Sequence, residues 1–355
     1  MRLNKILYKT LAVLLACLFM TGTAADCFSK PVDTYRSSSV LADGRWARVR
    51  VSQDGMQLLT NEQLKDLGFS DPSKVRVYGY GGRELPLSFD STTPDDLPMQ
   101  LVVRTARGIL FYGTGTVDWQ LKGSKLVHRQ NPYGTVSYYF LSDRDAEDLV
   151  REALDEPYGS DDEVVTAVTH TLLHEQEMAA AGHTGGDLFG EDFRATSTRT
   201  FSFDMPCAVD DVVRYKVFFG TKASGTSKVY LLQDDDEIGS VAISGVSDSD
   251  IHLSLKSVSG EGRIKDGKGE LGIKFDGTGV VTTARLDFIE AAYLRELRLT
   301  DNQLLFMHNV RRGTHEVFAI EGCEASTVIW DVSDPVSPRP VKYHLEGSRA
   351  MFAPT

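Results

Sequence analysis

The sequence predicts a mainly β protein with two β-rich modules after a cleaved signal peptide, the second module being a β-sandwich or jelly-roll-like domain. Short apolar segments recur at roughly ten-residue spacing between Gly, Asp and Ser turns, which is typical of sandwich domains. Trp46–Val51 alternates apolar and polar side chains, which indicates a strand with one buried face. The length of 355 residues accommodates two domains of common size.

The N-terminus has the parts of an export signal. Basic residues precede the apolar stretch Leu11–Met20, and small residues lead to a cleavage site near Ala25. We therefore predict a signal peptide over 1–25 and a leader over 26–44. The apolar stretch is about half of the roughly 20 residues that a membrane-spanning helix needs, so we expect no transmembrane span. A retained anchor and a lipoprotein formed through Cys17 are the alternatives.

The composition argues against nucleic-acid binding. The formal net charge is −12 and the pI is near 5.2, whereas a grip on phosphates needs clustered Lys and Arg. Hydrophobic residues at 41% and charged residues at 25% are ordinary for a folded globular protein.

The first module is predicted over 45–145. Asp54-Gly55 is typical of a hairpin turn. Thr60 and Gln63 form a capping box for a short helix, and Gly68 can end that helix in a left-handed conformation. The predicted strands are 46–51, 75–78, 100–104, 109–112 and 137–141.

A connecting segment is predicted over 146–192. Ala146–Leu154 has the composition of an acidic helix, and Val164–Leu173 is rich in β-branched and apolar residues, which favours a strand. Met178–Gly186 contains small residues and several glycines, and is expected to be a loop.

The sandwich-like module is predicted over 193–332, and the Pro-containing stretch 333–355 has the composition of a linker. The predicted strands of this module are 200–203, 212–219, 228–232, 240–243, 252–258, 270–275, 280–290, 294–299, 303–306, 315–320 and 327–332.

Two sequence patterns resemble reactive or ligand-binding motifs. His174-Glu175 begins like a helical zinc-protease motif, but Met178 stands where the second histidine is needed, and His183 follows a Gly-bearing stretch that does not favour a helix. A structural or interface role is the favoured interpretation. Gly79–Gly82 is similar to a nucleotide-binding loop but lacks the third glycine, so a turn with positive φ explains it better.

The cysteines leave two interpretations open. Cys27, Cys207 and Cys323 follow the signal peptide, and an odd number indicates one disulfide and a spare thiol. Cys207 with Cys323 is the expected pair because both lie in the second β-rich region. Three free thiols are the alternative. Cys323 with His308 or His315 can also be drawn as a catalytic pair, although a packed thiol is the commoner role.

We expect no metal or cofactor. The acidic pairs lack the ligand spacing of a calcium loop and are typical of solvated turns. No serine nucleophile elbow is present in the sequence. The acidic pairs are Asp161-Asp162, Asp210-Asp211 and Asp234–Asp236.

Several short sequence motifs are informative because of the order in which they follow one another along the chain. They are Trp46–Val51, Gln63–Pro72, Val75–Gly82, Asp95–Pro98, Leu110–Tyr112 leading to Trp119, Asn131–Tyr133 before Tyr138–Leu141, His174-Glu175, Phe189–Phe193 and Trp330–Pro335. In this order they resemble the non-catalytic N-terminal region of the type IX secretion system sortase (PorU-type), of the gingipain-like cysteine peptidase family from Bacteroidota. The resemblance covers nearly all of the mature chain.

The resemblance implies a role at the outer membrane. Members of the family cleave the C-terminal sorting domain from secreted cargo and attach the cargo to a surface lipopolysaccharide, alongside an outer-membrane barrel shuttle. The implied partners are the C-terminal sorting domains of secreted cargo and the outer-membrane barrel shuttle. The implied location is the periplasm or cell surface, in association with the outer membrane. The family's catalytic histidine and cysteine follow the region that matches Trp330–Pro335, and the sequence ends at Thr355. We therefore expect a truncated scaffold that carries no catalytic residue.

Two other hypotheses belong to different classes of protein. The aromatic run Tyr138–Phe140 suggests a free-standing carbohydrate- or protein-binding sandwich, although strand core explains it more easily. Use of Cys323 with a histidine would instead make the chain a complete cysteine peptidase.

Overall fold

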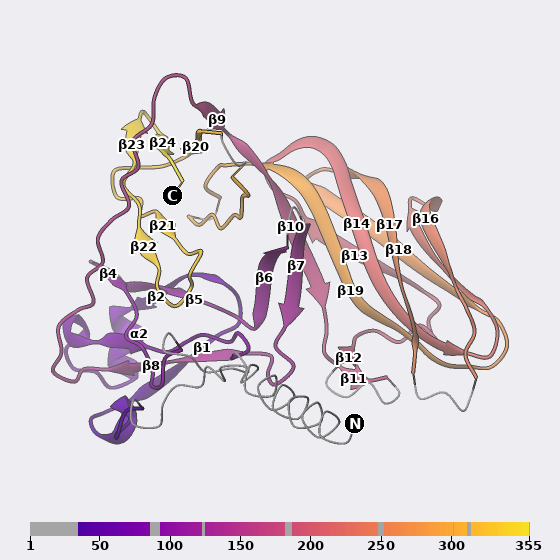
Figure 1. Ribbon diagram of the computed structural model, residues 1–355, viewed down its shortest axis with the longest axis horizontal. Coiled ribbons are helices and arrows are strands. Elements are labelled where there is room, and N and C mark those ends of the chain that lie inside the picture. The colour runs from indigo at the N-terminus through magenta and orange to yellow at the C-terminus, as the bar shows by residue number, and fades with distance from the viewer. Residues whose placement is uncertain are drawn as a thin grey trace, which may run out of the picture. The chain divides into compact units, whose positions relative to one another are not determined.

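The computed structural model describes residues 35–85, 93–122, 125–181, 187–247, 252–300, 302–310 and 314–354. The predicted signal peptide, with Cys17, and the neighbouring Cys27 lie outside these residues. The described residues are mainly β, as the sequence predicts (Figure 1). No helix among them is long and apolar enough to cross a bilayer.

The chain divides into two compact units, Met1–Asp43 with Leu85–Pro98, and Gly44–Glu84 with Met99–Thr355. The first unit contains the short 3-10 helix η2 (Val40–Ala42). Asp96 holds its start, because Asp96 accepts hydrogen bonds from the Val40 amide and from the Ser39 hydroxyl at 3.0 Å.

The second unit begins with two three-stranded sheets around one core that contains Leu64, Phe69, Phe111 and Tyr139. The capping box of the helix α2 (Asn61–Asp66) is confirmed, and Gly68 follows it with φ +87°. The sheets have the orders β1 (Ala47–Val51), β8 (Ser137–Ser142), β3 (Arg76–Tyr78) and β2 (Gly55–Thr60), β5 (Gly108–Gly113), β4 (Val102–Thr105), and the 3-10 helix η3 (Pro72–Lys74) precedes β3.

The hairpin predicted at Asp54-Gly55 is wrong. β1 pairs with β8 and β2 pairs with β5, so the two strands that flank Asp54-Gly55 belong to different sheets. The pattern marked a true change of direction, but the strand partners are set by packing of distant segments.

A sandwich-like sheet forms the largest part of this unit, and Figure 1 shows its long strands β14, β17, β18 and β19 side by side. Its core contains Val213, Tyr215, Phe219, Leu231 and Ile289. The strand order is β10 (Ala167–Glu175), β19 (Val281–Glu296), β14 (Ala208–Ala223), β17 (Ser254–Lys265), β18 (Lys268–Gly277), β15 (Ser227–Gln233) and β16 (Asp236–Ile243), with β13 (Thr198–Asp204) also pairing with β18. The strands predicted at 280–290 and 294–299 are largely one strand, β19.

The stretch predicted as a linker over 333–355 instead contains strands. Phe352 of β24 packs with Phe318 of β20 in a separate apolar core, with ring centroids 5.5 Å apart. Apolar side chains between the prolines and the end of the chain explain the difference. The sheet order is β23 (His344–Glu346), β24 (Arg349–Phe352), β20 (Glu316–Glu321) and β9 (Glu163–Val165), and a small pair joins β21 (Trp330–Asp331) with β22 (Arg339–Pro340).

The acidic helix predicted over Ala146–Leu154 is absent, since this described stretch is irregular. Asp148 accepts bonds of 2.7 and 2.8 Å from Arg104, and the Leu154 amide donates to the Pro340 carbonyl at 2.8 Å. These tertiary contacts override the local helix propensity. In the loop expected over Met178–Gly186, β11 (Ala179–Ala180) pairs with β12 (Leu188–Phe189), and 182–186 lie outside the described residues.

Candidate functional site

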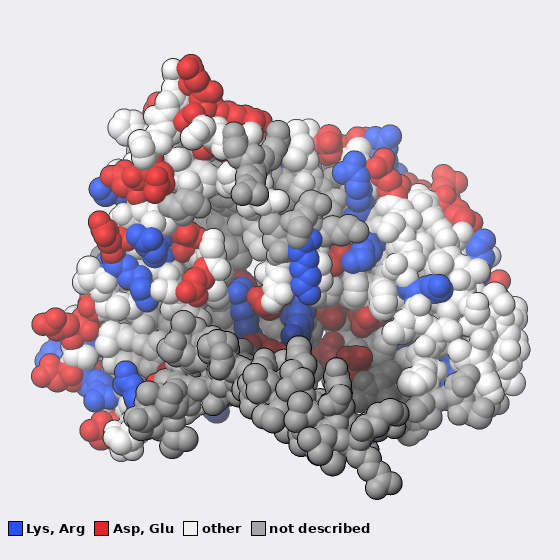
Figure 2. Space-filling model, in the orientation of Figure 1, with Lys and Arg blue, Asp and Glu red and all other residues white. Residues whose placement is uncertain are grey.

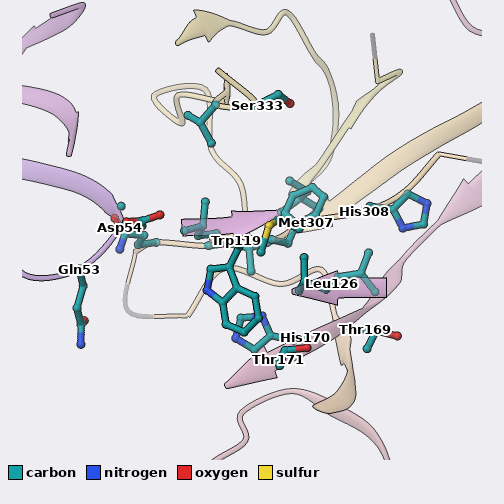
Figure 3. Close-up of a pocket in the computed structure, with 18 of the residues that line it drawn as sticks. Gln53, Asp54, Trp119, Leu126, Thr169, His170, Thr171, Met307, His308 and Ser333 are labelled. Carbon is teal, nitrogen blue, oxygen red and sulfur yellow. The ribbon is translucent and has the colours of Figure 1, made fainter. Parts of the chain in front are cut away.

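A large cavity lies over the outer face of the sheet region formed by β10, β19 and β14. Its volume is about 2120 Å³, which exceeds the roughly 300–1,000 Å³ of small-molecule pockets. Figure 3 shows Trp119 and Leu126 in this cavity together with Thr169 and Thr171 of β10. The remaining lining comes from the first-module segments 52–56 and 110–117, from β14 and β19, and from the segments 302–310 and 322–333. The size suits a polypeptide segment better than one small ligand.

Strand alternation decides which side chains reach the cavity. Ile289 and Ala291 of β19 are buried in the sandwich core, so Glu290 between them points to the outer face and lines the cavity. On β10, the His170 ring lies 5.7 Å from the Tyr293 ring on the core side. Thr171 of the same strand belongs to the outer face.

A hairpin packs on this outer face, and its two strands were not among those predicted from the sequence. It joins β6 (Val117–Lys122) to β7 (Lys125–Gln130). His128 makes the contact: its Nδ1 lies 2.8 Å from Glu290 Oε1, and its Nε2 lies 3.4 Å from Glu175 Oε2. The His128 ring also contacts the Phe288 ring edge-on, with centroids 4.4 Å apart.

The sequence did contain a signal for this hairpin. Val117–Lys122 alternates apolar and polar side chains, and it is followed by Gly123-Ser124, a dipeptide typical of two-residue hairpin loops. His128 itself stands in no recognisable motif, because its partners Glu175 and Glu290 are far away along the chain.

His128 is cationic at neutral pH in this environment. Burial is the largest influence and lowers its pKa, but hydrogen bonds with Glu175 and Glu290 together outweigh burial and raise the pKa to about 9. Lys216 Nζ lies 3.0 Å from Glu290 Oε2, so Glu290 is shared between two cations. Burial raises the pKa of Glu290, and its bonds to His128 and Lys216 lower it, with a net lowering.

Further carboxyl groups gather at the end of β10. Burial, followed by repulsion from Glu175, raises the pKa of Asp287 to about 7. Burial also raises the pKa of Glu177 to about 7, and the charges of Glu175, Asp287 and Asp187 add to this. Near neutral pH these two groups are therefore partly protonated, chiefly because of burial and secondarily because of the neighbouring carboxylates.

His174 and Glu175 do not act together. They are neighbours on a β-strand, so their side chains lie on opposite faces. His174 Nε2 lies 2.8 Å from Glu191 Oε1 on the core side, whereas Glu175 reaches His128. The zinc-protease motif therefore does not form, and His183 lies outside the described residues. Among the described residues, no group of three His, Cys, Asp or Glu side chains could hold a metal ion.

Cys323 lacks the environment of a nucleophile. Its side chain is buried in the third apolar core, and burial raises the pKa of the thiol. His308 Nε2 lies 2.7 Å from Glu316 Oε2, and its ring stands edge-on to Phe318 at 5.3 Å. His315 is exposed. A catalytic cysteine needs a stabilised thiolate, so this arrangement favours a packing role.

The expected disulfide is not formed in the structure. Cys207 and Cys323 are both free thiols, Cys207 being partly exposed and Cys323 buried. Cys207 has φ +56° just before β14, and its carbonyl accepts a bond from the Glu296 amide at 2.8 Å. Membership of the same β-rich region was therefore too coarse a criterion for pairing them.

The other sequence motifs are turns. Gly79 and Gly81 have φ of +151° and +83°, as expected for a glycine turn. Asp234 and Asp235 also have positive φ and connect β15 with β16. In the remaining acidic pairs, Asp211 Oδ1 lies 2.7 Å from Arg263 Nη1, and Asp162 Oδ2 accepts a 2.8 Å bond from the Gly159 amide.

The aromatic run Tyr138–Phe140 does not form one binding platform. Tyr139 is buried in the core and its hydroxyl accepts a 3.0 Å bond from the Thr114 amide. Tyr138 points to the surface, where the Arg48 guanidinium lies 4.3 Å from its ring centroid. On the face drawn in Figure 2, basic and acidic side chains of the described residues are interspersed, so this face offers no broad basic surface for nucleic acid.

No protein-family model matches the sequence, and no curated protein matches it. A solved structure does: dimeric latent PorU from Porphyromonas gingivalis is 28% identical, with a TM-score of 0.78 over 89% of this chain. The chain spans 31% of the length of that protein. The fold described above is therefore PorU-like.

Two viral structures carry no argument about the fold. They are the infectious bursal disease virus Gx strain and the VP2 subviral particle of the same virus, each 10% identical, with TM-scores of 0.12 and 0.13. The matches cover 75% and 73% of this chain and 79% and 83% of the viral chains.

Proposed function

We propose that this chain is the non-catalytic N-terminal portion of a PorU-type sortase of the type IX secretion system. In this role it is exported and serves as a scaffold that docks secreted cargo or the outer-membrane shuttle. The similarity to PorU over 89% of the chain carries the proposal. The ordered motif series from Trp46 to Pro335 supports the same family.

The sites of the two candidate reactive groups support a role without peptide-bond cleavage. Cys323 is buried with a raised thiol pKa, and His308 is engaged by Glu316. The cavity beside β10 instead supports binding of a polypeptide, since it is too large for one small ligand.

Incubation of the purified mature chain with the C-terminal sorting domain of a type IX cargo protein tests the proposal. We expect saturable binding by calorimetry and an intact sorting domain by mass spectrometry. A Cys323→Ala variant should behave like the parent chain. Cleavage that disappears in Cys323→Ala would overturn the non-catalytic role, and absence of binding to both the sorting domain and the purified shuttle would overturn the scaffold role.

A further inference from the structure

The outer edge of β10 has unpaired backbone groups. β10 is the terminal strand in the order β10, β19, β14, β17. The Leu297 amide donates to the Thr166 carbonyl at 2.8 Å, in the same antiparallel register that pairs Ala167 with Glu296. Hydrogen-bonded pairs alternate in such a ladder, so every second residue from Ala167 directs its amide and carbonyl away from β19. Those residues are Ala167, Thr169, Thr171, Leu173 and Glu175.

This open edge borders the cavity. The residues with outward backbone groups all line it, and none has a backbone partner on that side among the described residues. Figure 3 shows Thr169 and Thr171 along the strand, with Trp119 and Leu126 in the same cavity. The strand is nine residues long and contains no Pro or Lys. Edge strands are usually shortened, interrupted or charged with such residues to prevent pairing, so β10 remains competent to pair.

The lining indicates the side chains that a partner should bring. Met307, Val310 and Val328 line the cavity although they are 45%, 37% and 40% exposed. Apolar side chains from a bound segment would cover them. Strand geometry places alternate side chains of such a segment on this face.

The edge of β10 ends at Glu175, next to a group of carboxyl side chains that a positive charge would stabilise. Glu175 repels the carboxyl groups of Glu177 and Asp287, and Asp187 adds to the same cluster. His128 Nε2 lies 3.4 Å from Glu175 Oε2, but the same ring is also bound by Glu290 at 2.8 Å. A lysine or arginine from a partner would offset this excess of negative charge.

We propose that the open edge of β10 docks one extended segment of a partner polypeptide. The segment adds to the sheet as a further strand, places apolar side chains at alternate positions in the cavity, and carries a lysine or arginine next to Glu175. Pairing through main-chain hydrogen bonds is a common mode of peptide recognition. The inference rests on the proposed function for the identity of the partner, a cargo or shuttle protein, and on the geometry of β10 for the site.

A matched pair of variants tests the edge. The amide of Thr171 points away from β19, so Thr171→Pro removes an edge donor while sparing the β10–β19 ladder. Thr171→Val keeps the amide and the side-chain volume. The probe is a fluorescent nine-residue peptide that alternates valine and threonine and has lysine at both ends. Anisotropy should show binding to the parent and to Thr171→Val, and at least about tenfold weaker binding to Thr171→Pro.

A second arm leaves the protein unchanged, in case Thr171→Pro is poorly folded. The same peptide with alternate amides N-methylated should bind at least about tenfold more weakly than the parent peptide. Hydrogen exchange of the Thr169, Thr171 and Leu173 amides should be fast in the free monomer and slow with the unmethylated peptide. Slow exchange in the free monomer, equal binding of both peptides, or a Thr171→Pro effect on self-association alone would each overturn the proposal.

The sorting domain separates this inference from the proposed function. Equal binding of the sorting domain to Thr171→Pro and Thr171→Val would place docking elsewhere and leave the scaffold role standing. The strand peptide could bind more weakly to Thr171→Pro than to Thr171→Val while neither the sorting domain nor the shuttle binds the protein. That result would support the docking site at β10 and refute the scaffold role.

Discussion

His128 and Glu290 are 162 positions apart in the sequence, and the Nδ1 of His128 lies 2.8 Å from the Oε1 of Glu290. Their side chains are only 5% and 11% exposed. This contact fixes the β6–β7 hairpin on the outer face of the sheet, where Glu290 and the hairpin residues Trp119 and Leu126 line the cavity. The position of one wall of the candidate site therefore depends on a buried ion pair.

Removal of the imidazole should destabilise the protein. His128→Gln leaves the carboxylates of Glu290 and Glu175 without their shared cation, and breaking a buried ion pair typically costs about 3 kcal/mol. The free energy of unfolding from urea titration measures the loss. His344→Gln is the matched control, because His344 is exposed on β23 and should change stability little.

A double-mutant cycle assigns that loss to the pair itself. Glu290→Gln and the combined His128→Gln/Glu290→Gln variant complete the cycle. We expect the double variant to lose less than the sum of the single losses, by about 1 kcal/mol or more, because the partners are in direct contact. Strict additivity would contradict the coupling.

Stability should fall as the solution becomes alkaline. The folded-state pKa of His128 is about 9, above the ordinary value of 6.5. Its contribution is therefore complete below pH 6.5 and is lost as the pH rises through 9. The raised pKa of Asp287 and of Glu177, both about 7, makes stability fall already between about pH 4 and 7, because these groups ionise in the unfolded chain while the folded protein keeps them protonated.

Urea midpoints between pH 6.5 and pH 9.5 measure the histidine contribution. The parent chain should lose stability over this range, and His128→Gln should lose clearly less. Parallel profiles for the two proteins would refute the assignment to His128.

Local chemistry in the sequence predicted the local elements well. Thr60 and Gln63 predict the start of a helix because the two hydrogen bonds of a capping box lie within one turn. Both hydrogen bonds are present in the structure. Gly68 ends the helix with positive φ for the same kind of local reason. The failure at Ala146–Leu154 is different, because Arg104 and Pro340, which hold this segment, are distant in the sequence.

The candidate site was largely beyond such reasoning. His174-Glu175 drew notice as an adjacent pair, but a strand separates the two side chains onto opposite faces. The open edge of β10 depends on which strands pair, and that follows from the packing of the whole sheet. Residues such as Thr171 have no chemical signature, since their relevance lies in the direction of the backbone.

The two described thiols should differ sharply in reactivity. Cys207 is partly exposed, whereas Cys323 is 3% exposed and burial raises its pKa. In a Cys27→Ser background, a chromogenic disulfide reagent should label one thiol quickly in the native protein and the second only in denaturant. Cys207→Ser in the same background should remove the fast phase. Failure to label either thiol in denaturant without reductant would instead show a bridge between Cys207 and Cys323.

Two glycines with positive φ should respond differently to alanine. Gly81 has φ +83°, and an added Cβ would lie 1.7 Å from Thr114 Oγ1 and 2.9 Å from the Tyr139 hydroxyl. Gly347 has φ +64° with no atom within 4 Å of such a Cβ. Both substitutions incur the left-handed strain of about 1–2 kcal/mol, but Gly81→Ala adds overpacking of about 1–3 kcal/mol. Thermal unfolding should therefore occur at a clearly lower temperature for Gly81→Ala than for Gly347→Ala. Equal shifts in the unfolding temperature would mean that Thr114 and Tyr139 move aside without a measurable cost. Glycine at position 81 would then be required only by its positive φ.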